Sequence, residues 1–526
     1  MYAGVGGTTM RGYALGLLVM VEVACGQSSE PRLDGSLDAP LDPCAPPGSC
    51  IAPARPSLSG AYPLLTGRQW DRTVSDLLGV EERPRLEPRV PVVDPRRPST
   101  SSDVVEGRRA DAQRELAEEV AFEVTRDPTL LSRITRLGGS DSDPRTFYPA
   151  FLARAYRRPP TEAELAAVLA MHARGATEYP DEPPLAAGVR LVIEAVLQSP
   201  AFLYRTMSGE SREGVVTLDG FSLASRLSYA LWDSMPDDAL FADAASGALL
   251  EPEGFRAHAF RMLDDPRAVS KVGDFHVAYL GAIEPSAALV ETRRLSARLV
   301  LDDAATVRDL LTTRAAFGNQ LAEVYEATPT DDEWLRLDER RPGLLTRRHW
   351  LERVRNPVSR GVDVVTRWLC IDIPPPPVPV PPESEGVGDT RRERIESLTR
   401  EEGCIDCHRV IDPIGFAFES FDAEGRWRTE EPPSGAPIDT TGEVIVAERT
   451  LVFSGAADLV TQLAELPELH RCYAKHWQAV LLEDPSYVDD TSLDLVAEGS
   501  VTRGWSIAEV IVALLNSDSF RTRRAE

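Results

Sequence analysis

Lysine is almost absent from this sequence, and acidic residues outnumber basic ones. The 526 residues include two lysines, Lys271 and Lys475, and 57 basic residues stand against 83 acidic ones, so the formal net charge is −26. A surface this acidic repels phosphate backbones and anionic lipid headgroups. We therefore expect no nucleic-acid partner.

Long hydrophobic runs are also missing. No stretch after the N-terminal region reaches the roughly 18 apolar residues that a membrane-spanning helix needs. The N-terminal run Gly12–Val21 is too short for a span, but it follows Arg11 and leads to a small residue and Cys25. This order is typical of a bacterial lipoprotein signal, and plain secretion is the alternative because Glu22 departs from the pattern.

We therefore predict that residues 1–25 are a lipoprotein-type signal peptide and that Cys25 is lipidated. The protein is then exported, either to the periplasm or to the outer-membrane or cell surface. It contacts the membrane only through its lipid anchor.

Cysteine is infrequent, and its positions support export. The sequence has seven: Cys25, Cys44, Cys50, Cys370, Cys404, Cys407 and Cys472. Cys44 and Cys50 flank a short stretch that they are able to close as a loop. With Cys25 lipidated and Cys404 and Cys407 in a motif of their own, two cysteines remain on apolar, helix-like stretches. We predict a disulfide between Cys370 and Cys472 in an oxidising compartment; two buried free thiols are the alternative.

The segment GCIDCHRVIDPIGF, at 403–416, contains the spacing Cys-x-x-Cys-His. This is the pattern of c-type haem attachment. Two thiols one helical turn apart, Cys404 and Cys407, can add to the two vinyl groups of haem. The adjacent His408 then binds the iron from the proximal side. We predict one covalent haem c on these three residues.

Three other interpretations of the motif remain open. A structural zinc site needs a second ligand pair at close spacing, and the sequence has no second Cys-x-x-Cys. A thioredoxin-like dithiol needs a strand before the motif, whereas the preceding segment RRERIESLTREEGC is charged and helical. A purely structural role is the third. The sequence also lacks a nucleophile elbow, a phosphate-binding loop and a dinucleotide fingerprint.

Methionine is missing downstream of the motif, since the last one is Met262. A Met placed after the attachment motif is therefore excluded as the distal iron ligand. His476 is the main histidine candidate, because it follows Cys472 by four residues and shares its helical face. The other candidates are His470, His276 and His349. We expect an open or weakly ligated iron, which would bind peroxide or another small ligand.

The length of the chain predicts several packed subdomains rather than one core. Apolar residues recur at helical spacing, with start signals such as the capping box of Thr161 and Glu164. Between Gly435 and Phe453 the pattern is that of a short β-hairpin. We predict a mostly α-helical fold with these parts: a flexible tether at 26–59, helical modules at 60–82, 105–205 and 216–345, a cytochrome c-like haem module at 346–450, and a C-terminal helical module at 451–526.

Residues beside the motif are candidates for supporting roles. A backbone carbonyl at the Asp412–Pro413 turn is a candidate acceptor for the Nδ1–H of His408, with an ordinary Asp-Pro turn as the alternative. Arg426 and Arg428 are candidates for binding the haem propionates, because a guanidinium group matches a carboxylate. A surface ion pair is the alternative for both arginines.

Long blocks of the sequence match a known pattern in order: LLTGRQWDRTVSDLLGV, FLARAYRRPPTEAEL, LDGFSLASRLSYALWDSMPDDAL, RPGLLTRRHWLERVRNPVSRGVDVVTRWLC and CIDCHRVIDPIGFAFESFDAEGRWR. Together they resemble a secreted bacterial multi-module family of unknown function that has a planctomycete-type cytochrome c-like segment. The chain departs from that family at LLEDPS, where a Gly-Arg pair is usual, and at Asn356, where Ser is usual. The resemblance implies an architecture and a haem, and it implies no substrate.

Two functions follow from these observations. The first is redox: an exported c-type haem protein in electron transfer or a haem-dependent reaction, with an unknown redox partner. The second is a cell-surface binding or scaffolding protein whose haem segment is structural or vestigial.

Overall fold

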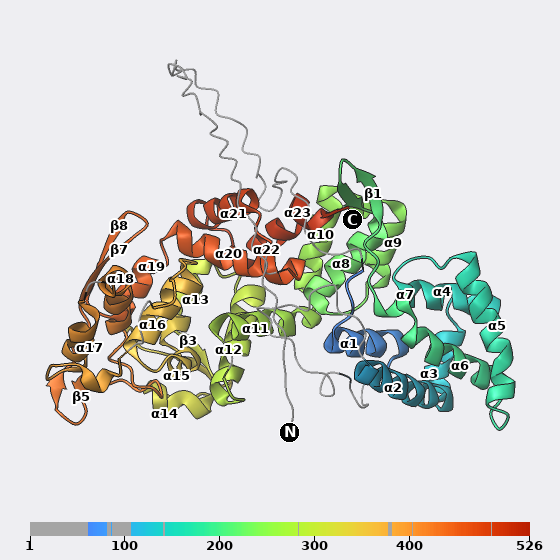
Figure 1. Cartoon of the computed structure of the whole chain (residues 1–526). Helices are drawn as coiled ribbons and strands as arrows, with labels where there is room; N and C mark the ends of the chain where they lie inside the picture. The colour runs from blue at the N-terminus through green and yellow to red at the C-terminus, as the bar shows by residue number, and fades with distance from the viewer. Residues whose placement is uncertain are drawn as a thin grey trace, which may run out of the picture. The chain divides into compact units, whose positions relative to one another are not determined.

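The computed structural model describes residues 62–80, 86, 107–139, 142–281, 283–376, 381–401, 403–484 and 487–525 (Figure 1). The predicted signal peptide, the lipidation site Cys25, the tether at 26–59 and the pair Cys44 and Cys50 lie outside these residues. In the described part the fold is mostly α-helical, as the sequence predicts, and the short strands pair antiparallel. Among the helices of the described residues, none combines the length and the hydropathy that a membrane span requires.

The described residues of the first part form the helices α1 (Gly67–Leu78), α2 (Gly107–Arg126), α3 (Pro128–Thr135), α4 (Pro144–Tyr156), α5 (Glu162–Glu178), α6 (Pro184–Gln198) and α7 (Pro200–Leu203). Two of them begin at capping boxes, in which Thr66 and Thr161 each accept a hydrogen bond from an amide three residues ahead. Their apolar faces meet in one cluster that includes Trp70, Phe151 and Leu197.

The central part contains these helices: α8 (Gly220–Trp232), α9 (Asp238–Ser246), η2 (Ala248–Leu250), α10 (Pro252–Leu263), α11 (Pro266–Leu280), α12 (Ala287–Ala297), η3 (Arg298–Asp302), α13 (Val307–Thr312), η4 (Asn319–Leu321) and α14 (Ala322–Tyr325). It also holds two hairpins, β1 (Gly209–Arg212) with β2 (Val215–Leu218), and β3 (Ala315–Phe317) with β4 (Trp334–Arg336). The second hairpin belongs to a small separate core around Tyr325.

The part that contains the Cys-x-x-Cys-His motif has these elements: η5 (Leu344–Thr346), α15 (Arg348–Arg353), α16 (Pro357–Asp363), η6 (Val364–Trp368), η7 (Glu383–Glu385), α17 (Arg391–Thr399), α18 (Ile405–Phe416), β5 (Glu430–Glu431), β6 (Ala436–Pro437), β7 (Gly442–Val446) and β8 (Arg449–Phe453). The predicted hairpin is present as β7–β8. Its turn residues Ala447 and Glu448 both have positive φ, as a two-residue hairpin turn requires. Along β7 the burial alternates, so that Val444 and Val446 face the core.

The C-terminal part comprises α19 (Ala456–Leu463), α20 (Pro467–Leu482), α21 (Asp490–Thr502), α22 (Ile507–Leu515), α23 (Asp518–Arg521) and β9 (Thr522–Arg524). Strand β9 pairs with β2 and completes the sheet β1-β2-β9. The buried Arg226 of α8 donates hydrogen bonds to the carbonyls of Phe520 and Thr522. This end of the chain is therefore bound to the start of the central part.

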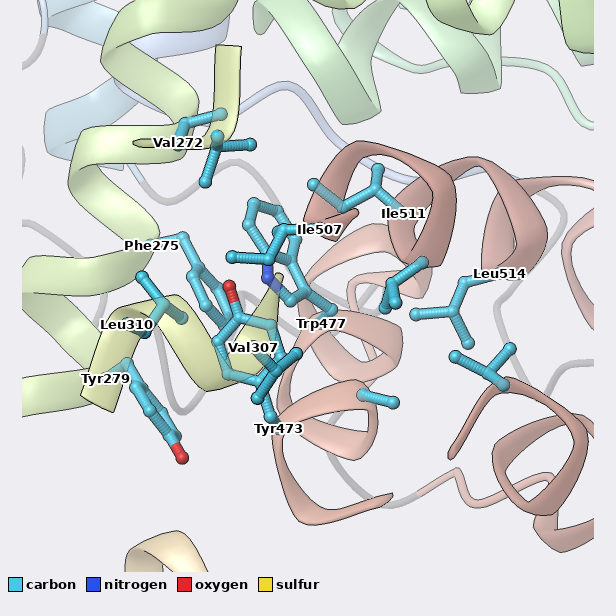
Figure 2. Close-up of a cluster of buried hydrophobic side chains, with 14 of the residues drawn as sticks. Val272, Phe275, Tyr279, Val307, Leu310, Tyr473, Trp477, Ile507, Ile511 and Leu514 are labelled. Carbon is cyan, nitrogen blue, oxygen red and sulfur yellow. The ribbon is translucent and has the colours of Figure 1, made fainter. Parts of the chain in front are cut away.

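One hydrophobic cluster extends through the central, motif-containing and C-terminal parts. Figure 2 shows the portion in which side chains of α11 and α13 meet those of α20 and α22. The rings of Phe275 and Trp477 stack there with centroids 3.7 Å apart. Buried residues of the modules predicted at 216–345, 346–450 and 451–526 all contribute to this cluster.

Candidate functional site

Cys404, Cys407 and His408 lie together at the start of α18. Gly403 precedes them with a φ of +91°, a conformation that favours glycine, and it turns the chain from α17 into α18. The amide of His408 donates to the carbonyl of Cys404 at 3.1 Å, so the three residues share one helical turn. Both thiols are free and half-buried.

Asp412 fixes the imidazole of His408 from one turn further along α18. The Nδ1–H group donates to Oδ1 of Asp412 at 2.8 Å, and Asp412 is only 5% exposed. The hydroxyl of Thr399, the last residue of α17, donates to Oδ2 of the same carboxylate, also at 2.8 Å. Within the described part of the chain, Nε2 of His408 has no hydrogen-bond partner. The ring is therefore held at one nitrogen and available at the other.

The acceptor for His408 differs from the one that the sequence suggested. A backbone carbonyl in a turn was expected, but Pro413 lies inside α18, which continues to Phe416. The side chain of Asp412 takes this place instead. The spacing of four residues between His408 and Asp412 was the available signal, because residues i and i+4 are neighbours on a helix surface.

Two glycines let α16 and α18 approach closely. A Cβ atom at Gly361 would lie 2.0 Å from the carbonyl oxygen of Ile411, and a Cβ atom at Gly415 would lie 2.0 Å from that of Pro357. No larger residue fits at these distances without movement of the backbone. The motif is therefore attached to a helix that packs directly on its neighbour.

A buried ion-pair cluster follows α18. The carboxylate of Glu419 lies 3.1 Å from Arg360, 3.4 Å from Arg391 and 3.1 Å from Arg428. Burial lowers the pKa of Arg360 to about 10. Arg428, one of the two candidates for a haem propionate, is thus paired with Glu419, whereas the side chain of Arg426 is 59% exposed.

Three histidines that the sequence offered as iron ligands are buried and hydrogen-bonded at both ring nitrogens. Their partners are Val272 and Tyr473 for His276, Thr292 and Gly281 for His349, and Ser500 and Ala464 for His470. Burial lowers the pKa of all three, that of His276 to about 4. In this structure they are neutral core residues.

Cys370 and Cys472 form a disulfide, with their Cα atoms 5.4 Å apart. His476 lies beside it, one turn after Cys472 on α20. Its Nε2 atom is 3.1 Å from the carbonyl oxygen of Arg367 and 3.9 Å from Sγ of Cys370. The role of His476 as a distal iron ligand stays a prediction.

The residues at the motif fit covalent haem attachment. That chemistry needs two free thiols and one available imidazole nitrogen on a single helical turn, and all three are present. The adjacent Ile405 is 40% exposed and offers apolar surface. A thioredoxin-like site fits less well, because the element before the motif is helix α17 and not a strand.

Three segments of the chain match known protein families. Residues 144–206 match PSD5, a protein of unknown function (DUF1595), residues 218–289 match PSD4, a protein of unknown function (DUF1592), and residues 341–431 match PSCyt3, a protein of unknown function (DUF1588). The chain is similar to a multi-module family of unknown function. No curated protein and no solved structure matches the chain.

The PSCyt3 segment contains the whole arrangement around the motif. It includes both thiols, His408 with Asp412 and Thr399, and the ion-pair cluster of Glu419. Cys472 and His476 lie outside it. The geometry that fits haem attachment is therefore internal to one family segment.

Proposed function

We propose that the protein is an exported c-type haem protein, with one haem c on Cys404 and Cys407, that acts in electron transfer or a haem-dependent redox reaction. One observation carries the proposal. Two free, half-buried thiols and an imidazole with an available Nε2 atom share a single turn of α18. The name of the matching family, PSCyt3, supports a cytochrome-like character.

Each residue of the turn has a defined role in this proposal. Cys404 and Cys407 would hold the haem through two thioether bonds, because their S–H groups can add across its two vinyl groups without a further reactant. His408 would ligate the iron through Nε2, because Asp412 keeps the proton on Nδ1. Bound haem c supplies one-electron chemistry at its iron.

We propose that the second face of the iron is open or weakly ligated. Recruiting His276, His349 or His470 would break two hydrogen bonds in the core. An open coordination position on the iron would accept water or a small molecule such as a peroxide. The protein would then be able to catalyse a reaction and not only to transfer electrons.

The proposed compartment is the periplasm or the outer-membrane or cell surface. The disulfide between Cys370 and Cys472 supports an oxidising environment. A lipid on Cys25 would anchor the protein, and the net charge of −26 disfavours a nucleic-acid partner. Because this protein is strongly acidic, we expect the docking surface of its redox partner not to be anionic, since like charges repel.

Absorbance spectroscopy tests the proposal. The full chain is produced in a bacterial host with haem-attachment machinery, and the purified protein is extracted with acidified acetone. We expect a Soret band that survives extraction and one haem per chain. A well-folded wild-type protein without this band would overturn the proposal.

Two matched pairs of substitutions serve as controls. The variant Cys404→Ser with Cys407→Ser should lose the resistant band, while Cys370→Ser with Cys472→Ser should keep it. Reversible reduction and reoxidation of the bound haem then distinguishes the redox function from a scaffolding protein with an inert haem.

A further inference from the structure

The acceptor for the Nδ1 proton of His408 is the buried carboxylate of Asp412. Its charge affects the electron density of the imidazole as well as the orientation of the ring. We infer that Asp412 gives the imidazole partial anionic character and thereby sets a low reduction potential for the site. This inference rests on the proposed haem. It assigns Asp412 as a positioning residue that acts through His408.

The hydrogen bond is well defined. Nδ1 of His408 and Oδ1 of Asp412 are 2.8 Å apart, and both residues lie on α18, one turn from each other. A donor–acceptor distance of this size is normal for a bond to a charged acceptor. Asp412 is 5% exposed, so water weakens the interaction little.

A second donor keeps the carboxylate in place. Thr399 approaches from α17, and its hydroxyl binds Oδ2, which leaves Oδ1 for His408. The same Thr399 hydroxyl lies 3.1 Å from the carbonyl of Ile395 in its own helix. The three side chains thus form a chain from α17 to the imidazole, and the acceptor cannot rotate away without losing both bonds.

The electronic effect follows from the charge of the acceptor. A carboxylate attracts the Nδ1 proton more strongly than a neutral carbonyl does, and this raises the basicity of Nε2. A more basic ligand donates more electron density to the metal and favours the oxidised iron over the reduced iron. The reduced protein is therefore a strong one-electron donor, and its partner is an acceptor of higher potential.

Spectroelectrochemical titration of the haem-loaded full chain tests the inference. The variant Asp412→Asn keeps the size and an acceptor oxygen but removes the charge. We expect its midpoint potential to rise by about 59 mV or more, which is a tenfold change in the equilibrium constant between oxidised and reduced iron.

Asp406→Asn is the matched control. Asp406 lies on the same turn as the motif and is exposed, so its substitution removes the same charge without touching His408. Its midpoint potential should stay close to that of the wild type. An equal shift in both variants would assign the effect to net charge and overturn the inference, as would an unchanged potential in Asp412→Asn.

The haem content of each protein is measured alongside the potential. An extraction-resistant haem in the wild type with no effect of Asp412→Asn refutes only the role of Asp412. A wild-type protein without covalent haem refutes the proposed function and this inference together. If Asp412→Asn loses its haem, Asp412→Glu, which restores the charge, takes its place in the titration. It should keep the haem with a potential near that of the wild type, and a potential raised by about 59 mV or more in this variant would overturn the inference.

Discussion

The hydroxyl of Tyr473 donates a hydrogen bond to Nε2 of His276, at 2.9 Å, across the contact between α20 and α11. The direction of this bond is fixed because Nδ1 of the same ring lies 2.8 Å from the carbonyl of Val272 and must carry the proton. The ring is fully buried, and burial lowers its pKa to about 4, so it is neutral at pH 7. Its partner Tyr473 is labelled in Figure 2.

Acid should therefore destabilise the protein through His276. Its pKa is lowered to about 4 in the folded state by burial, whereas the unfolded value is about 6.5. Between these values the unfolded chain binds a proton that the folded chain does not, so the free energy of unfolding falls as the pH falls from about 6.5 to 4. The contribution of this residue is up to about 3 kcal/mol.

Urea unfolding at pH 7 and at pH 4.5 checks this prediction. The loss of stability on acidification should be smaller in His276→Gln than in the wild type. Tyr473→Phe is the control: it lowers stability at both pH values but keeps the acid sensitivity, because burial is the main cause of the low pKa. Equal acid sensitivity in wild type and His276→Gln would contradict the prediction.

The disulfide between Cys370 and Cys472 should contribute a large share of the stability. It closes a loop with a sequence separation of 102 residues. The chain-entropy account of such a loop gives about 4–5 kcal/mol. Guanidinium unfolding with and without a dithiol reductant should show a loss of this order in the wild type. The variant Cys370→Ser with Cys472→Ser should be equally unstable in both conditions, and a wild type indifferent to the reductant would argue against the bond.

Substitution of the glycines between α16 and α18 should be costly. Gly415→Ala places a methyl group against the carbonyl of Pro357, and the helices must separate to accept it. We expect a loss of about 3 kcal/mol in the free energy of unfolding, at the upper end for overpacking. Gly214→Ala, in the open turn between β1 and β2, introduces backbone strain alone and should cost about 1 kcal/mol. A Gly415→Ala variant no less stable than Gly214→Ala would show that the contact relaxes freely.

The predicted signal peptide leads to a chemical test of the N-terminus. Mass spectrometry of the membrane fraction should find a diacylglycerol-modified Cys25 as the first residue of the mature chain. Cys25→Ala should release the protein into the soluble exported fraction or leave the precursor uncut. Cleavage at another residue, or an unmodified Cys25, would rule out the lipoprotein form.

Local signals made much of the fold predictable. The capping box of Thr161 and Glu164 marks the start of α5 at Glu162 in the sequence and in the structure. The β-branched pattern after Gly435 predicts the hairpin β7–β8. The proximity of Cys404, Cys407 and His408 was likewise predictable, because the three residues lie on one helical turn and their spacing alone brings them together.

Apart from the pairing of Cys370 with Cys472, relations between distant residues were not predictable from the sequence. Phe275 and Trp477 stack although about 200 residues separate them, and no local pattern encodes that pairing. Thr399 reaches Asp412 only because α17 ends beside α18. The Asp-Pro pair at 412–413 was a misleading signal, since proline usually interrupts a helix, yet α18 continues through it.

The pairing of β9 with β2 constrains how the molecule is made. Strand β2 ends at Leu218 and β9 begins at Thr522, so the ribosome adds about 300 residues between the two partners. At about 5–20 residues per second this takes roughly 15–60 s. During that time β2 has an open edge and the buried position of Arg226 lacks the carbonyls that it binds. Biosynthesis therefore passes through a state in which β2 lacks its partner β9. A binding protein that covers the free edge of β2 would prevent it from pairing with another chain.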